Sequence, residues 1–293
     1  MSPGARLPAH RVAVAVPCWN EGPRIPALLA ALRALDPAPG VLLVLDDGSD
    51  DDTFARIDVD GVVALRHERN EGLGAGRNTL WREARKRGFP VVAFLDADVT
   101  PAPDHVRRVA ELFGDERAVA GVGGPNVEQA TTRRVDAWRS RFWRQDLGEA
   151  PLLDAPMLVG ANAAYRTDAL HDVAGFRATF RTNGEDVDVG RRLRAAGYRL
   201  RYEPSLVVTH RREDDVGSLV RCCYRHCRDG MRATLATPGE VPEPAELVLG
   251  LARKAARAPA AALLKRHDPK EAVLGVLACG AGLAGYAVGT LRP

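Results

Sequence analysis

Residues 91–98 read VVAFLDAD, a continuous apolar run that ends in two aspartates. The same arrangement occurs at 41–47, where VLLVL precedes two further aspartates, and at 11–17, where RVAVAV precedes a proline. Continuous apolar runs of this length are typical of strands that are buried on both faces of a parallel sheet. Further apolar runs and helical patterns extend the series at 62–65, 118–122, 25–32, 78–87 and 106–113. The sequence therefore predicts an α/β fold, with a mostly parallel sheet covered on both faces.

The second half of the chain is less regular. Strand-like runs are short, and the last stretch, residues 272–291, contains no charged residue. We expect helices at 131–147, 186–196, 217–235 and 245–266, and strands at 199–202 and 206–210.

Composition narrows the function classes. Of 293 residues, 46% are hydrophobic, which is enough for a large core, and the length suggests about two domains. The 41 Lys and Arg against 38 Asp and Glu are too balanced for a protein that coats nucleic acid. The five cysteines are odd in number, and no apolar signal segment precedes the first strand, so we expect a cytoplasmic protein.

Acidic residues follow two of the predicted strands. Asp46 and Asp47 fit either a turn with a helix N-cap or a site that binds a ribose or a base. Asp96 and Asp98 lie two residues apart on an extended segment, so their carboxylates project to one side. Such a pair suits Mg²⁺ or Mn²⁺ beside a diphosphate, although a polar strand end before a helix is the alternative.

Three other features have both a structural and a functional interpretation. The glycine-rich loop at 70–78 has Arg77 where a dinucleotide fingerprint needs its last glycine, which disfavours a Rossmann oxidoreductase. Glu185 and Asp186 open a predicted helix, either as an ordinary acidic first turn or as a general base at a loop–helix junction. His210 ends a strand and is either structural or a ligand.

In their order along the chain, these blocks resemble family 2 glycosyltransferases of the GT-A fold. The resemblance covers about residues 10–212, with Trp19 in place of the usual tyrosine and without the Q-x-x-R-W block of processive synthases, which favours transfer of a single sugar. The blocks are VAVPCWNE at 14–21, LDDGSDDDT at 45–53, NEGLGAGRN at 70–78, DAD at 96–98, GANAAYR at 160–166, GF at 175–176, EDVD at 185–188 and PSLVVTH at 204–210.

The resemblance implies a Rossmann-like GT-A sandwich and a role for each site residue. Asp186 would be the general base, with Glu185 beside it in the catalytic pair. Asp98 would bind Mg²⁺ or Mn²⁺, with Asp96 at the ribose or a metal-bound water and His210 completing the metal site. The nucleotide-sugar site would comprise Pro17, Asn20, Glu21, Asp46, Asp47, Asp96 and Arg77, the last near the diphosphate.

The function implied is inverting, metal-dependent transfer of a hexose. The donor would be a UDP, GDP or dTDP sugar, and the acceptor a lipid, a glycan or a small molecule. One alternative is a GT-A-like nucleotidyltransferase, but residues 17–22 lack the lysine of such a loop. The other is a catalytically inactive partner protein that binds sugar nucleotides, which the intact Asp47, Asp98 and Asp186 disfavour.

We expect a catalytic domain at 1–212, with a nucleotide-binding half at about 10–125 and an acceptor half at about 126–212, and a helical extension at 213–293. Residues 272–291 are long enough to span a bilayer, although five glycines dilute their hydrophobicity. Lysines and arginines at 253–270 favour anionic lipids and the cytoplasmic face of a membrane. The open alternatives are a span, surface attachment, and helices packed on the catalytic body or on another copy.

Overall fold

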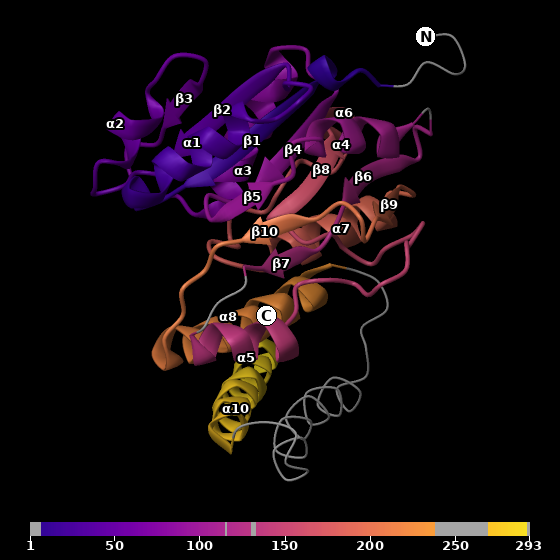
Figure 1. Ribbon diagram of the computed structural model, residues 1–293. Helices are drawn as coiled ribbons and strands as arrows, with labels where there is room; N and C mark the ends of the chain where they lie inside the picture. The colour runs from indigo at the N-terminus through magenta and orange to yellow at the C-terminus, as the bar shows by residue number, and fades with distance from the viewer. Residues whose placement is uncertain (1–6, 115, 130–132, 238–268, 292–293) are drawn as a thin grey trace. The chain divides into compact units, whose positions relative to one another are not determined.

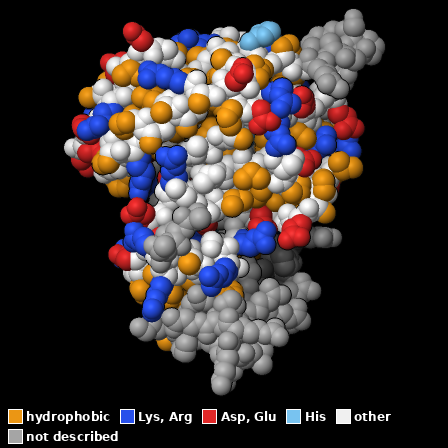
Figure 2. Space-filling model, viewed as in Figure 1, with side chains coloured by type: hydrophobic (Ala, Val, Ile, Leu, Met, Phe, Trp, Pro, Cys, Tyr) orange, Lys and Arg blue, Asp and Glu red, His pale blue; other side chains and the backbone are white. Residues whose placement is uncertain are grey.

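The computed structural model describes residues 7–114, 116–129, 133–237 and 269–291. The chain divides into two compact units, Met1–Val127 with Gln145–Arg211 and Glu128–Arg144 with Arg212–Pro293. Acidic and basic side chains are interspersed over the face shown in Figure 2. The helix predicted at 245–266 lies outside the described residues.

A seven-stranded sheet forms the centre of the first unit, in the order β3-β2-β1-β4-β8-β6-β9 (Figure 1). Neighbouring strands are parallel except at β8, which runs antiparallel to both β4 and β6. The predicted α/β fold with a mostly parallel sheet is therefore confirmed. The strands are β1 (Val12–Cys18), β2 (Val41–Asp46), β3 (Val63–Arg66), β4 (Val91–Leu95), β6 (Val119–Gly123), β8 (Asn162–Arg166) and β9 (Arg199–Tyr202).

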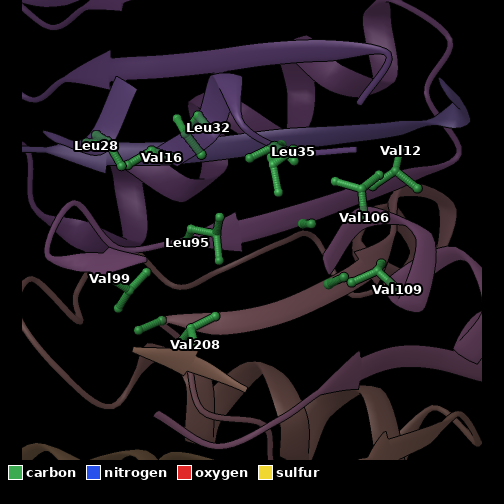
Figure 3. Close-up of a cluster of buried hydrophobic side chains, with 14 of the residues drawn as sticks. Val12, Val16, Leu28, Leu32, Leu35, Leu95, Val99, Val106, Val109 and Val208 are labelled. Carbon is green, nitrogen blue, oxygen red and sulfur yellow. The ribbon is translucent and has the colours of Figure 1, made fainter. Parts of the chain in front are cut away.

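Helices cover both faces of this sheet, because alternate residues of each buried strand point to opposite sides. Val12, Val14 and Val16 of β1 pack with α1, α2 and α4, in the cluster of which Figure 3 shows a part. Ala13 and Ala15 face the other cluster, with α3, α6 and α7. The helices are α1 (Ile25–Arg33), α2 (Thr53–Ile57), α3 (Leu73–Lys86), α4 (His105–Phe113), α6 (Thr167–Asp172) and α7 (Glu185–Ala195), with 3₁₀ turns at Ala9–Arg11 and Gly22–Arg24.

A second, three-stranded sheet has the order β5-β10-β7. Its strands are β5 (Val99–Pro101), β10 (Val208–His210) and β7 (Asn126–Glu128). The antiparallel pairing of β5 with β10 sets His210 opposite Val99. His210, near the end of the first unit, is thereby brought beside the Asp-Ala-Asp segment at 96–98.

Three sequence-based predictions of elements were wrong in detail. The glycine-rich stretch is not all loop, because α3 begins at Leu73 instead of Asn78. The helix predicted at 131–147 is confined to α5 (Arg134–Phe142), although residues 131–132 lie outside the described part. The GANAAYR block contains an unforeseen strand, β8.

Within the second unit, α5 contributes Trp138 to an apolar cluster with α8 (Val216–Ala236) and α10 (Pro269–Leu291). Glu128–Arg144 therefore groups with Arg212–Pro293 in the second unit. The acceptor half predicted at about 126–212 stays a prediction. Glycines bring α10 close to α8: a Cβ at Gly289 would lie 2.6 Å from the Arg228 carbonyl oxygen.

The opposite side of α10 is exposed and uncharged. Val273–Leu291 has a mean hydropathy of 1.6, and 39% of this stretch is buried. It is the one helix among the described residues that is long and apolar enough to cross a bilayer. The exposed residues of this stretch are Val273, Val276, Leu277, Gly280, Ala284, Ala287, Thr290 and Leu291, and most of them lie along one helical stripe.

Candidate active site

The loops after β1 and β2 are tied together by hydrogen bonds. The amide of Asn20 donates to Ser49 Oγ at 2.8 Å, and that of Glu21 to Thr53 Oγ1 at 2.9 Å. Asn20 has a φ of 55°, a left-handed conformation that asparagine tolerates better than most residues. The serine and threonine of the DDGSDDDT block thus position Asn20 and Glu21, while Pro17 lies within β1 itself.

Asp46 is fully buried and stabilises the turn that follows β2. Its Oδ1 accepts the Ser49 amide at 3.0 Å, and Arg66 Nε lies 3.3 Å from its Oδ2. Because its carboxylate is fully buried and contacts Ser49 and Arg66, Asp46 lies below the loop after β2 and is not exposed at its surface.

Asp47 anchors the glycine-rich segment. Its Oδ1 accepts the Glu71 amide at 2.9 Å and its Oδ2 the Gly72 amide at 2.8 Å. His67 Nδ1 lies 2.6 Å from Asp47 Oδ1, and His67 Nε2 lies 2.8 Å from Thr79 Oγ1 on α3. His67 is not among the site residues predicted from the sequence, although its position just after β3, where other strands carry polar residues, was the available signal.

The first amides of α3 are occupied by backbone carbonyls. Leu73 N donates to Arg181 O at 2.8 Å and Gly74 N to Phe180 O at 3.2 Å. The lack of a side chain at Gly74 permits this approach, because a Cβ there would lie 2.6 Å from the Arg177 carbonyl oxygen. The glycines therefore serve contact between two backbone segments.

Arg77 lies on α3, and its side chain is 2% exposed. Its Nη1 donates to Glu185 Oε1, and its Nη2 donates to Asp96 Oδ1 at 3.1 Å. Burial opposes the charge of Arg77, but the carboxylates of Glu185 and Asp96 outweigh it and raise the pKa of Arg77. Both Nη atoms are thus engaged by carboxylates, and the contact that we predicted with a diphosphate stays a prediction.

The two aspartates of the Asp-Ala-Asp segment contact different partners. Whereas Asp96 binds Arg77, Asp98 Oδ2 lies 3.1 Å from His210 Nε2. Both aspartates are partly open to solvent, with side chains 35% and 23% exposed. Desolvation, together with the charge of Asp98, raises the pKa of Asp96 against the opposing charge of Arg77.

Glu185 and Asp186 form the first turn of α7, as predicted. Gly184 caps the helix with a φ of 90°, which glycine adopts without strain. Asp186 Oδ2 accepts the Gly160 amide at 3.2 Å. Burial raises the pKa of Glu185 to about 7, with Arg77 opposing, and its Oε2 has no hydrogen-bond partner among the described residues.

The acidic strand ends converge around β1. Burial raises the pKa of Cys18, and the nearby carboxylates of Glu21, Asp46, Asp96 and Asp98 raise it further. Carboxylate oxygens gathered in this way suit a hard divalent cation, and Asp98 with His210 offers an oxygen and a nitrogen side by side. No group of three or more His, Cys, Asp or Glu in the described residues could hold a metal alone. The donor set therefore fits Mg²⁺ or Mn²⁺ where a ligand supplies further oxygens.

Gly160 provides a first test of this geometry. A Cβ at this position would lie 2.5 Å from Arg77 Nη1 and 2.9 Å from Nη2. We expect Gly160→Ala to destabilise the protein by about 1–3 kcal/mol, as overpacking commonly does, and to lower its activity. Gly230→Ala in α8 is the matched control, because nothing lies within 4 Å of its added Cβ. Equal melting temperatures for the two variants would contradict this description of the site.

Comparison with known proteins identifies the family to which this fold belongs. Residues 13–174, more than half of the chain, match the family description "Glycosyl transferase family 2". The chain belongs to this family.

Several characterised relatives share the matched region. The pre-mycofactocin glycosyltransferase of Mycobacterium tuberculosis is 35% identical over 69% of this chain, which spans only 43% of that longer protein. The polyprenol monophosphomannose synthase of Mycolicibacterium smegmatis is 28% identical over 64% of this chain and 68% of the relative.

Solved structures show the same fold. One is the mannosyltransferase PcManGT from Pyrobaculum calidifontis in complex with GDP-Man and Mn²⁺. The match covers 94% of this chain and 86% of the PcManGT chain, with a TM-score of 0.63 and 21% sequence identity. GalNAc-T7 with UDP, GalNAc and Mn²⁺ matches 68% of this chain and 42% of its own with a TM-score of 0.54 at 17% identity.

Proposed function

We propose that the protein transfers one hexose from a nucleoside-diphosphate sugar to an acceptor hydroxyl, with inversion at the anomeric carbon. The observation that carries the proposal is that Arg77 joins Asp96, which follows β4, to Glu185, which directly precedes Asp186 on α7. Two residues after Asp96, Asp98 contacts His210. The Mn²⁺-bound mannosyltransferase and GalNAc-T7 complexes of the same fold support a divalent ion and a sugar nucleotide.

Asp186 is the proposed general base. The acceptor oxygen forms a bond to the anomeric carbon while the bond to the diphosphate oxygen breaks, and the diphosphate leaves with the electron pair. Because a sugar hydroxyl is a very weak acid, its proton passes to the Asp186 carboxylate during the attack. The amide of Gly160 holds that carboxylate in place.

Asp98 and His210 would hold Mg²⁺ or Mn²⁺, with Asp96 beside them. When bound, such an ion neutralises the charge that develops on the departing diphosphate. Asn20, Glu21, Pro17 and the β2 turn containing Asp46 and Asp47 are the proposed nucleotide side, in which the hydrogen bonds to Ser49 and Thr53 fix the loop.

A screen of nucleotide sugars tests the function. We expect a UDP, GDP or dTDP sugar with Mn²⁺ to raise the melting temperature, and the same donor to release nucleoside diphosphate when an acceptor is present. Release of pyrophosphate from a nucleoside triphosphate and a sugar phosphate would instead indicate a nucleotidyltransferase. A thermal shift without turnover on any acceptor would indicate a binding protein.

We further propose that the acceptor is a lipid, a glycan or a small molecule, and that α10 attaches the protein to the cytoplasmic face of a membrane. The name of one relative, the polyprenol monophosphomannose synthase of Mycolicibacterium smegmatis, supports a lipid. Attachment by one side of α10 is favoured over a span, because α8 covers the other side and carries buried Asp229. Inserting α8 and α10 together into the hydrocarbon core of a bilayer would bury the charge of Asp229 at high cost.

Membrane fractionation tests this proposal. We expect the full-length protein to sediment with membranes and to be released by carbonate, because a surface-bound helix is held by one apolar stripe and by headgroup charge. Val276→Asp with Leu277→Asp should weaken sedimentation, since both side chains are exposed. Thr290→Asp, which adds a single charge at the one polar side chain among the exposed residues of Val273–Leu291, should weaken sedimentation less than the double change. Wild-type protein that stays in the low-salt supernatant would refute attachment, and release by detergent alone would indicate a span.

A further inference from the structure

The guanidinium of Arg77 is enclosed on several sides. The rings of Phe94 and Phe176 each have their centroid 5.8 Å from Cζ, and they meet each other edge to face. The backbone of Gly160 closes another side, so closely that a Cβ would collide with Nη1. Arg77 therefore has little space to turn without displacing aromatic rings or backbone.

Moving Arg77 toward a ligand would also uncover a buried charge. Glu185 is 2% exposed, and Nη1 of Arg77 supplies the hydrogen bond to its Oε1. An ionised carboxylate left buried without its partner is strongly unfavourable. Swinging the guanidinium out to bind a phosphate would thus break both of its charge-assisted hydrogen bonds to carboxylates.

We propose that Arg77 is a positioning residue that joins the Asp-Ala-Asp segment to the acid pair of α7, and that it does not bind the diphosphate. Its two Nη atoms fix Asp96 and Glu185 relative to each other. The planar guanidinium can bind two carboxylates in one geometry, which a lysine ammonium cannot reproduce. The proposal rests on the glycosyltransferase function proposed above.

Arg77 reaches the proposed base by two routes. Glu185 directly precedes Asp186, so that holding Glu185 fixes the first turn of α7. The Gly160 backbone, where an added Cβ would lie 2.5 Å from Nη1 of Arg77, donates its amide hydrogen bond to Asp186. Displacement of a reacting group by about 1 Å can cost about 100-fold in rate, so loss of Arg77 should act on turnover more than on donor binding.

The test compares Arg77→Ala and Arg77→Lys with the wild type. We expect Arg77→Ala to lower kcat about 100-fold, while KM and the calorimetric Kd for the nucleotide sugar change by no more than about 3-fold. Millimolar guanidinium chloride should restore at least about a tenth of the lost turnover, because it fills the vacated space and bridges the carboxylates again. Equal sodium chloride should not restore it. Arg77→Lys should remain impaired although it keeps the charge.

Arg87→Ala, at the end of the same helix, is the matched control, because Arg87 is exposed and pairs with Glu83. It should match the wild type. If Arg77→Ala does not fold, Arg77→Gln, whose side chain fills more of the space, takes its place in the Kd and kcat measurements.

A nucleotide-sugar Kd that rises about 10-fold or more with the loss of Arg77 would overturn the proposal in favour of a phosphate contact. A folded Arg77→Ala variant that guanidinium does not rescue would overturn it in favour of a purely structural role. If the wild-type protein transfers no sugar, the proposed function itself is refuted. The assay of the wild type alone distinguishes this outcome from a failure of the proposal on Arg77.

Discussion

Asp186→Asn should lower turnover about 10²- to 10⁴-fold, the usual contribution of a positioned base. Asparagine has nearly the same shape and can still accept the Gly160 amide, so the first turn of α7 should keep its place. The affinity for the nucleotide-sugar donor should therefore change little, because the proposed nucleotide side lies on the loops after β1 and β2. The measurement is kcat in a coupled assay of nucleoside-diphosphate release, together with calorimetric Kd.

Asp154→Asn serves as the control for Asp186→Asn. Asp154 is an exposed carboxylate that pairs with Arg194, and it has no place in the proposed site. Retention of more than about a tenth of wild-type turnover by Asp186→Asn would remove Asp186 as the base. A comparable loss from Glu185→Gln alone would then move that role to Glu185.

Asp98→Ala should lower turnover by at least about 100-fold and also weaken donor binding, since the diphosphate would lose its counter-ion. It removes the carboxylate that contacts His210 and so one of the two proposed metal donors. Calorimetry with the nucleotide sugar in Mn²⁺ and in EDTA gives the test. Wild-type affinity should fall in EDTA, whereas the variant should bind weakly in both.

Asp168→Ala, which removes a carboxylate with an 84% exposed side chain, is the control for Asp98→Ala. If the donor Kd changes neither in EDTA nor on Asp98→Ala, the Asp-Ala-Asp segment does not act through a metal ion.

Much of the fold followed from local pattern. The run at 91–95 became β4 with unchanged bounds, because a buried parallel strand needs apolar side chains on both faces. β8 was missed because Asn162–Arg166 has small and polar residues, and its pairing with β4 and β6 is decided by partners far along the chain. No local pattern specifies such pairings.

The start of α3 was missed for a related reason. Glycines disfavour a helix by local propensity, yet Gly74 and Gly76 lie inside it. The backbone around Arg177 leaves no room for a side chain at Gly74, and Leu45 would make a Cβ at Gly76 a tight fit. Tertiary packing outweighed propensity here.

The residues of the site were predictable as types, but their partners were not. Strand-end carboxylates could be read from the sequence, whereas the contact of Arg77 with Glu185 joins residues 108 positions apart. A basic residue in a glycine-rich segment suggests a phosphate, and only the fold reveals two carboxylates around it. The part played by His67 likewise depends on α3 passing beside β3.

The pairing of β5 with β10 has a consequence for synthesis of the chain. Asp98 and His210 are separated by 112 positions, so the carboxylate leaves the ribosome long before the imidazole beside which it finally lies. Until then the nascent polypeptide carries the Asp-Ala-Asp segment without its neighbouring strand. Domains generally fold as units during translation. The protein therefore brings Asp98 and His210 together late, when the end of the first unit has emerged. A product truncated before His210 would lack this contact.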